Sequence, residues 1–345
     1  MSRVCRVWSA VIASVVLTGA LGPMTSSAVA AEEVNVYSYR KPQLLEPMFD
    51  AFTQQTGIKV NSVFVSKGML ERLQSEGANT PADLIFTADI GHLADMKAAG
   101  LTQAVDSAEI TGNIPPQFRD PEGHWFGLTL RARIVVAAKD RVPQGAIARY
   151  EDLADPKWRG LICTRSGKHP YMTALIASMI VHHGEADAKQ WLKGLKENLA
   201  RKPQGNDRAQ VKAISEGECD VAIINHYYMA LMLSDPEQIA WARAVNVMFP
   251  NQNDRGTHMN VSGISLTRYA PHKESALKLM RFLASEQGQK MYVDDNGEYP
   301  VKLGVPWNAL QNSWGPFNAD AVDLAKVAAE RATAIRLADE VGYND

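Results

Sequence analysis

Residues 220–231 run Asp220-Val-Ala-Ile-Ile-Asn225-His-Tyr227-Tyr228-Met-Ala-Leu, and they show the architecture of the chain most clearly. The segment Asp220–Ile224 is short, apolar and β-branched, which predicts a buried strand. Asn225 is a good N-cap residue, so a helix should begin there and continue through Met229–Leu233. Tyr227 and Tyr228 then lie in the first turn of that helix, just beyond the carboxyl end of a strand. Open α/β sheets bind their ligands at such positions.

A second segment of the same construction ends at Tyr171. The apolar run that starts at Gly160 passes through Cys163 into a Ser/Gly turn, and Pro170 then takes the first position of a helix. Tyr171 follows, and residues 172–181 continue as an apolar helix. One tyrosine pair is usually amphipathic packing, but three phenols at two strand-to-helix junctions indicate a shared ligand.

The chemistry of the phenol group indicates which ligand this is. Phenolate is a hard, anionic oxygen donor whose conjugate acid has a pKa near 10. A helix N-terminus favours negative charge, and a strongly Lewis-acidic trivalent cation displaces the phenol proton. Hard oxygen ligands prefer hard cations, and three phenolates balance the charge of ferric iron. Tyr171, Tyr227 and Tyr228 therefore predict an Fe(III) site.

Residues 1–31 have the three parts of a secretory signal peptide. Two arginines are followed by the apolar run Val7–Leu21 and then by an A-x-A cleavage site, Ala28-Val-Ala30. The apolar run is shorter than the roughly 20 residues that a membrane span needs. We therefore expect export to the periplasm. The formal net charge of −2 gives no reason to expect nucleic acid or an anionic membrane as a partner.

The rest of the chain is long enough for two lobes. Strands expected at 34–38, 58–65 and 82–87 alternate with helices expected at 42–56, 67–76 and 90–99, which predicts a parallel sheet of βαβ units. The strand expected at 125–138 is long enough to cross between lobes. Further helices are expected at 191–199, 207–216, 273–296 and 319–338, with a return strand at 261–266. We expect one lobe to comprise 32–131 and 262–305, and the other 132–261 and 306–345.

Two cysteines remain after the signal peptide, Cys163 and Cys219. An even pair in an oxidising compartment predicts a disulfide bond. Each cysteine lies at a strand that leads to one of the tyrosine junctions, so the bond would tie the two junctions together.

Taken in order, these segments resemble the ferric-ion-binding periplasmic proteins, the solute receptors of ABC-type iron importers. The similarity covers essentially the whole chain after residue 31. Its motifs are Val36–Arg40, Pro81–Leu84, Trp125–Arg133, Arg165–Tyr171, Arg201–Arg208, Asn225–Tyr228, Gly256–Gly263 and Glu298–Val301. The resemblance implies a type II periplasmic binding protein, which is an α/β fold of two lobes joined by strand crossovers around a ligand cleft. It also implies a receptor rather than an enzyme.

The family's iron-binding tyrosines correspond to Tyr171, Tyr227 and Tyr228. Some relatives add ligands in an Arg-His-Tyr motif after the first strand, where this chain has Arg40-Lys41-Pro42. The resemblance therefore implies a three-tyrosine site that is completed by a synergistic anion, such as carbonate, or by water. It also implies a monomer that takes up free or weakly chelated ferric iron and delivers it to an ABC permease.

Arg40 and Arg131 are the candidates for binding that anion, because a guanidinium group matches a planar dianion bidentately. A surface ion pair is an equally open interpretation of each arginine. Tyr39 is a candidate fourth ligand, although strand alternation from Tyr37 leaves its direction open.

Other interpretations give different functions. A binding protein of the same fold for an oxyanion or small organic acid would use the tyrosines as hydrogen-bond donors. A non-haem iron enzyme could use His183-x-Glu185, but these residues are expected to cap a helix end and face solvent. His226 and His258 are expected to be structural. Four methionines near the tyrosine helices are expected to be core residues rather than copper ligands, namely Met172, Met179, Met229 and Met232.

Overall fold

A computed structural model describes residues 1–2 and 32–345. Almost all of the predicted signal peptide, residues 3–31, lies outside the described residues. Within the described part of the chain, no helix is long and apolar enough to cross a membrane.

The strand β4 (Phe126–Ala138) joins the two lobes, and every one of its residues is buried. Its first half pairs with β8 (Met259–Leu266), and its second half, from Arg133 onward, pairs with β6 (Val221–Asn225) and β7 (Val245–Met248). In the second half, successive side chains point into two different hydrophobic clusters, as strand geometry requires. The long strand predicted at 125–138 is therefore the crossover.

The first lobe is built on parallel strands. Strand β1 (Glu33–Ser38) lies between β2 (Lys59–Phe64) and β3 (Leu84–Thr87), and β3 pairs antiparallel with β8. Each of the three parallel strands, β1, β2 and β3, is followed by a helix. These helices are α1 (Glu46–Thr56, preceded by a short 3-10 turn at Pro42–Leu44), α2 (Met69–Glu76) and α3 (Ile90–Ala98). The lobe is completed by α4 (Ala108–Asn113), α10 (Lys273–Ala284), α11 (Glu286–Asn296) and the short strand β9 (Tyr299–Pro300), which pairs with β4.

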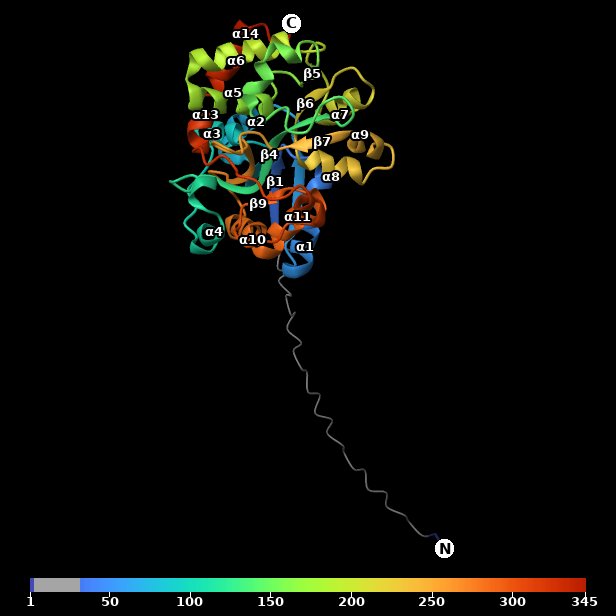
Figure 1. Ribbon diagram of the computed structural model, residues 1–345. Coiled ribbons are helices and arrows are strands. Elements are labelled where there is room, and N and C mark those ends of the chain that lie inside the picture. The colour runs from blue at the N-terminus through green and yellow to red at the C-terminus, as the bar shows by residue number, and fades with distance from the viewer. Residues whose placement is uncertain (3–31) are drawn as a thin grey trace. The chain divides into compact units, whose positions relative to one another are not determined.

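The second lobe places β5 (Ile162–Cys163) parallel to β6. Its helices are α5 (Pro170–His183), α6 (Glu185–Glu197), α7 (Asp207–Ser215), α8 (Tyr227–Leu233) and α9 (Ile239–Arg243). The chain ends with α12 (Ala309–Ser313), α13 (Leu324–Ala329) and α14 (Arg331–Glu340). Within residues 32–345, helices α5, α6 and α14 pack together at one end, and α1 and α10 lie at the opposite end (Figure 1).

Two of the predicted long helices are interrupted, so those predictions were wrong. The helix expected at 273–296 is divided at Ser285, whose side chain accepts a hydrogen bond from the N–H group of Gly288 and begins α11. The helix expected at 319–338 starts only at Leu324, after the N-cap Asp323, and is divided at Glu330. Short polar side chains compete for backbone N–H groups and start a new helix where apolar periodicity alone predicts continuation.

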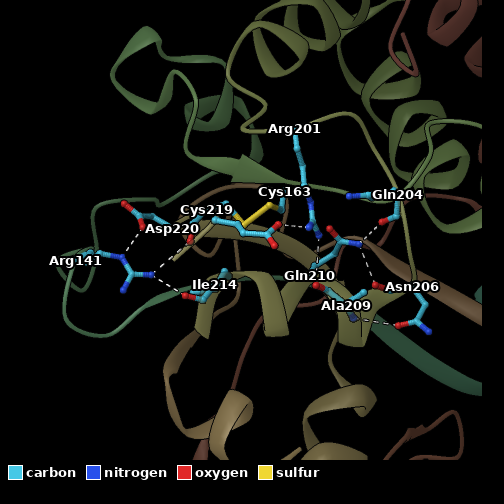
Figure 2. The surroundings of a disulfide bond; sticks show 11 residues. Arg141, Cys163, Arg201, Gln204, Asn206, Ala209, Gln210, Ile214, Cys219 and Asp220 are labelled. Atoms are coloured by element: carbon cyan, nitrogen blue, oxygen red, sulfur yellow. Dashed lines mark hydrogen bonds and ion pairs between the residues drawn. A yellow bond between two sulfur atoms is a disulfide. The ribbon is translucent and has the colours of Figure 1, made fainter. Parts of the chain in front are cut away.

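A disulfide bond joins Cys163 at the end of β5 to Cys219 just before β6, with 6.0 Å between their Cα atoms. Figure 2 shows the bond beside two ion pairs of the same region. Arg141 pairs with Asp220, and Arg201 pairs with Glu218. The covalent link thus connects the strand that leads to Tyr171 with the strand that leads to Tyr227.

Candidate metal centre

The junction between β6 and α8 holds Tyr227 and Tyr228. The helix begins at Tyr227, and the two phenol rings stack with their centroids 4.2 Å apart. The prediction that Asn225 caps this helix was wrong. Asn225 is the last residue of the strand, and its side-chain oxygen accepts a hydrogen bond of 3.1 Å from Arg133. The helix therefore follows the strand directly, and both phenols lie at its start.

The junction between β5 and α5 holds Tyr171 at the second position of the helix. His169 caps this helix, because its Nδ1 accepts the N–H group of Tyr171 at 3.2 Å. Three guanidinium groups surround the phenol ring of Tyr171. The central carbons of Arg131 and Arg165 lie 5.1 Å from the ring centroid, and that of Arg133 lies 5.9 Å away. The ring of Tyr171 therefore lies among three cationic side chains.

The buried carboxylate of Asp207 positions two of these arginines. It accepts hydrogen bonds from Arg133 at 2.9 Å, from Arg165 at 3.0 Å and from the backbone N–H of Asn225 at 2.8 Å. Burial would raise the pKa of Asp207, but Arg133 and Arg165 outweigh it and hold that pKa below its usual value. Asp207 thus ties the arginines around Tyr171 to the strand that leads to Tyr227.

All six residues proposed from the sequence line one cavity of about 690 Å³. They are Tyr39, Arg40, Arg131, Tyr171, Tyr227 and Tyr228. The lining also contains Lys41, Arg165 and Arg208, whereas among its described residues Asp295 is the single carboxylate. The cavity thus combines phenol oxygens with an excess of positive charge.

Arg40 and Arg131 are buried rather than paired at the surface, since their side chains are only 3% and 1% exposed. Arg40 donates to Ser262 at 2.7 Å and to Glu298 at 2.9 Å. Arg131 donates to the carbonyl oxygen of Ala88, and its Nε lies 3.9 Å from Glu298. Within the described part of the chain, Nη2 of Arg40 and Nε of Arg131 have no hydrogen-bond partner. A buried donor without a partner costs free energy, so an anion in this cavity would relieve that cost.

Burial raises the pKa of Tyr227 and of Tyr228. The negative charge that Tyr171 would carry adds to the shift of both residues. The pair therefore carries its phenol protons at neutral pH, and a ligand that needs phenolates has to displace them.

Tyr39 lies at the edge of the cavity. Its hydroxyl oxygen accepts the N–H of Met69 at 3.1 Å, and burial raises the pKa of its phenol. Tyr39, Ala88 and Tyr171 also line a second cavity of about 550 Å³, so the two spaces adjoin at these three residues.

His183 and Glu185 have structural partners. His183 pairs with Glu151 at 2.7 Å, and Glu185 pairs with Arg336 at 2.9 Å. Across residues 1–2 and 32–345, no three His, Cys, Asp or Glu side chains are grouped so that they could hold a metal.

The remaining histidines and methionines also have structural positions. The backbone N–H of His226 donates to the carbonyl oxygen of Ala132, and its Nδ1 accepts the N–H of the same residue, which anchors the crossover strand beside Tyr227. His258 is buried. The four methionines are divided between two hydrophobic clusters, Met172 and Met179 in one and Met229 and Met232 in the other.

Several residues of this site had no role assigned from the sequence, although they lie in conspicuous motifs. They are Arg133, Arg165, Asp207 and Glu298. Asp207 meets Arg165 and Arg133 across 42 and 74 residues of sequence. Only the tertiary structure shows that these charges pair under the tyrosines.

Two α/β lobes around strand crossovers, with a polar cavity for a small ligand, are the architecture of a solute-binding protein. The sequence model of the family described as bacterial extracellular solute-binding protein matches residues 79–318. The chain belongs to this family, whose members bind solutes and are not enzymes.

The names of several similar proteins refer to iron. Iron uptake protein A1 of Synechocystis sp. is 42% identical over 93% of this chain and 90% of its own length. The structure of apo ferric ion-binding protein A from Pasteurella haemolytica is 46% identical, with a TM-score of 0.88, and covers 91% of this chain and 99% of that one. The structure of Trichodesmium IdiA (FutA) with iron and citrate is 42% identical, with a TM-score of 0.85, over 90% and 99% of the two chains.

Proposed function

We propose that this protein is a periplasmic receptor for Fe(III), which it binds through the phenolates of Tyr171, Tyr227 and Tyr228 and delivers to an ABC permease. The observation that carries the proposal is the convergence of these phenols, from two separate strand-to-helix junctions, on one cavity. The names of the similar proteins support the same ligand, because they include an iron uptake protein and ferric ion-binding proteins.

The charges of the site suit an anion beside the iron. Three phenolates balance Fe(III). Glu298 supplies one negative charge to Arg40 and Arg131 together, so positive charge remains in excess beside the iron. Arg40 and Arg131 are buried, and each has an N–H that finds no hydrogen-bond partner among the described residues, so they are the proposed ligands of a synergistic anion. Carbonate fits the planar geometry of guanidinium, and the Trichodesmium structure contains citrate with its iron. Tyr39 is the candidate fourth oxygen ligand, since it lines the same cavity.

Binding then proceeds by exchange of protons for the metal. Fe(III) enters the cavity, the phenols of Tyr227 and Tyr228 lose their protons, and the guanidinium groups near Tyr171 stabilise the anionic donors. We place the lobe boundaries at 131/132 and 261/262, where two strand crossovers form the hinge, and a further boundary at 305/306. The lobes close over the ion by bending there, and the closed form is what the permease recognises.

Replacement of single tyrosines tests this proposal. Each of the variants Tyr171→Phe, Tyr227→Phe and Tyr228→Phe lacks one charged metal ligand. Their affinity for Fe(III), measured on the metal-free protein by competition with a chelator, should therefore fall by orders of magnitude. Tyr269→Phe is the matched control, because Tyr269 is exposed and lines neither cavity. Unchanged affinity in all three site variants would contradict phenolate ligation.

The excess of cationic side chains in the cavity favours one other function, the binding of an oxyanion or small organic acid. The tyrosines would then donate hydrogen bonds, and each Tyr→Phe change would cost about 1–3 kcal/mol of binding free energy. Binding of the anion without iron, with losses of that size, would favour this function over the first.

A further inference from the structure

Glu298 is a buried carboxylate next to both arginines that are proposed to bind the anion. It lies between the end of α11 and the short strand β9, and its side chain is 0% exposed. Its Oε2 accepts a hydrogen bond from Nη1 of Arg40 at 2.9 Å, and its Oε1 lies 3.9 Å from Nε of Arg131. Both arginines line the cavity that contains the three tyrosines, whereas Glu298 does not. Glu298 therefore acts on a ligand through its charge and through these two guanidinium groups, without touching the ligand itself.

The carboxylate of Glu298 is only partly neutralised by its hydrogen bonds. Within residues 1–2 and 32–345, its Oε1 has no hydrogen-bond partner. The other buried carboxylate of the site, Asp207, differs in this respect, because it accepts hydrogen bonds from two arginines and from a backbone N–H. In a protein interior a charge acts over a longer distance than in water. Glu298 thus projects more of its negative charge into the cavity than a fully hydrogen-bonded carboxylate would.

Glu298 and an anion in the cavity have to share the same two guanidinium groups. Nη1 of Arg40 donates to both Ser262 and Glu298, and Nη2 finds no partner in the described part of the chain. An anion that binds Nη2 therefore meets a guanidinium whose positive charge Glu298 already balances in part. The anion is also repelled by the carboxylate itself, since the two charges have the same sign.

The buried charges around the cavity indicate how much negative charge a ligand has to bring. Two buried carboxylates, Asp207 and Glu298, offset two of the four positive charges on the buried arginines, which are Arg40, Arg131, Arg133 and Arg165. Fe(III) with three phenolates is neutral, so two positive charges remain for a dianion. Without the charge of Glu298, three would remain.

We propose that Glu298 is a specificity-determining residue for the synergistic anion. As an internal counter-charge, it limits the affinity for the anion and the amount of negative charge that the site accepts. This inference rests on the proposed function and assigns control of the anion to a residue outside the lining of the cavity.

An ion pair that only holds Arg40 in place is the simpler interpretation of Glu298. The two interpretations predict effects of opposite sign. If Glu298 only positions Arg40, removal of its charge should weaken anion binding or leave it unchanged. If Glu298 is a counter-charge, the same removal should strengthen anion binding.

Three replacements of Glu298 separate its charge from its shape. Glu298→Gln keeps the size and an oxygen acceptor but removes the charge, Glu298→Ala removes both, and Glu298→Asp keeps the charge on a shorter side chain. Bicarbonate is titrated into the iron-loaded full chain in bicarbonate-free buffer, and the shift of the phenolate-to-iron band reports binding. Both uncharged variants should bind bicarbonate at least about tenfold more tightly than the wild type. Glu298→Asp should bind it as the wild type does.

The affinity for iron provides a second readout with the opposite sign. Without bicarbonate, the added positive charge of Glu298→Gln opposes a trivalent cation, so Fe(III) affinity in chelator competition should fall by at least about tenfold. General damage to the site would instead lower both affinities. Glu151→Gln is the matched control, because Glu151 pairs with Arg255 and lines neither cavity, and both of its affinities should equal those of the wild type.

The outcomes separate this inference from the proposed function. Unchanged or weaker bicarbonate binding in both uncharged variants would overturn the inference while the tyrosine site stands. A change in Glu298→Asp as large as that in Glu298→Gln would overturn it as well, because shape and not charge would then decide. A wild type that binds no Fe(III) would overturn the proposed function. Titration of sulfate into the metal-free protein by calorimetry then gives the same comparison, in which equal affinities of the wild type and Glu298→Gln would overturn the role of Glu298 separately.

Discussion

Asp207 is completely buried, and its two oxygens hold Arg133 and Arg165 close to Tyr171. Burial of a carboxylate is costly, and the two arginines offset this cost through charge-assisted hydrogen bonds. The sequence shows the tyrosines themselves, because each follows a strand at a helix start. It does not show Asp207, because pairing of charges across 42 and 74 residues depends on how the lobe folds.

Loss of this carboxylate should lower the free energy of unfolding of the second lobe. Asp207→Asn leaves two buried guanidinium groups without a counter-charge, which typically costs about 3–5 kcal/mol. The free energy of unfolding in urea measures the effect. Asp140→Asn is the matched control, because the Asp140 carboxylate is 73% exposed and pairs with Arg141 at the surface. Equal stability of the two variants would show that Asp207 is not the anchor of this network.

The phenols of Tyr227 and Tyr228 predict how iron affinity depends on pH. Burial raises their pKa, so both are protonated at neutral pH and below, and binding of Fe(III) releases these protons. Affinity should therefore rise with pH and fall as pH decreases from 8 to 5, by about tenfold per pH unit for each phenol proton displaced. Chelator competition at several pH values measures this slope, and a flat profile would exclude phenolate ligands.

At the scale of secondary-structure elements, two strand-to-helix junctions and the disulfide bond between them form one unit. The sequence predicted both junctions, because apolar runs and the turn residues around Pro170 are local signals. The predictions from the sequence were wrong where a single side chain changes the path of the backbone. Ser285 begins a new helix within a continuous apolar pattern, and Asn225 bonds to Arg133 instead of capping α8.

The disulfide bond should stabilise this unit because it lowers the conformational entropy of the unfolded chain. Its cysteines are 56 residues apart, and the chain-entropy model gives about 4 kcal/mol for a loop of that length. Unfolding in urea with and without a reductant measures the difference, and the Cys163→Ala/Cys219→Ala variant should show no effect of the reductant. Two free thiols in the unfolded, unreduced protein would exclude the bond.

At the scale of the whole molecule, the lobes meet at β4 and β8, and the cavity with the tyrosines lies beside this crossover. Residues from both lobes line it, with Tyr39 and Arg40 from the first and Tyr171 and Tyr227 from the second. The fold class and the crossover strand could be predicted from strand order and length. A ligand cleft and six of its lining residues could also be expected from the sequence and the family resemblance. The basic residues Arg165 and Arg208 could not be assigned to the cavity, because their segments meet the rest of the lining only when both lobes are assembled.

The visible spectrum of the metal-stripped protein, before and after addition of equimolar ferric iron in bicarbonate buffer, tests the tyrosine site most directly. Phenolate bound to Fe(III) produces a red-to-orange charge-transfer band. We expect this band in the wild type, and we expect it to shift or disappear in Tyr171→Phe, Tyr227→Phe and Tyr228→Phe. A protein that stays colourless would contradict the tyrosine site and leave the binding of an oxyanion as the function of this cavity.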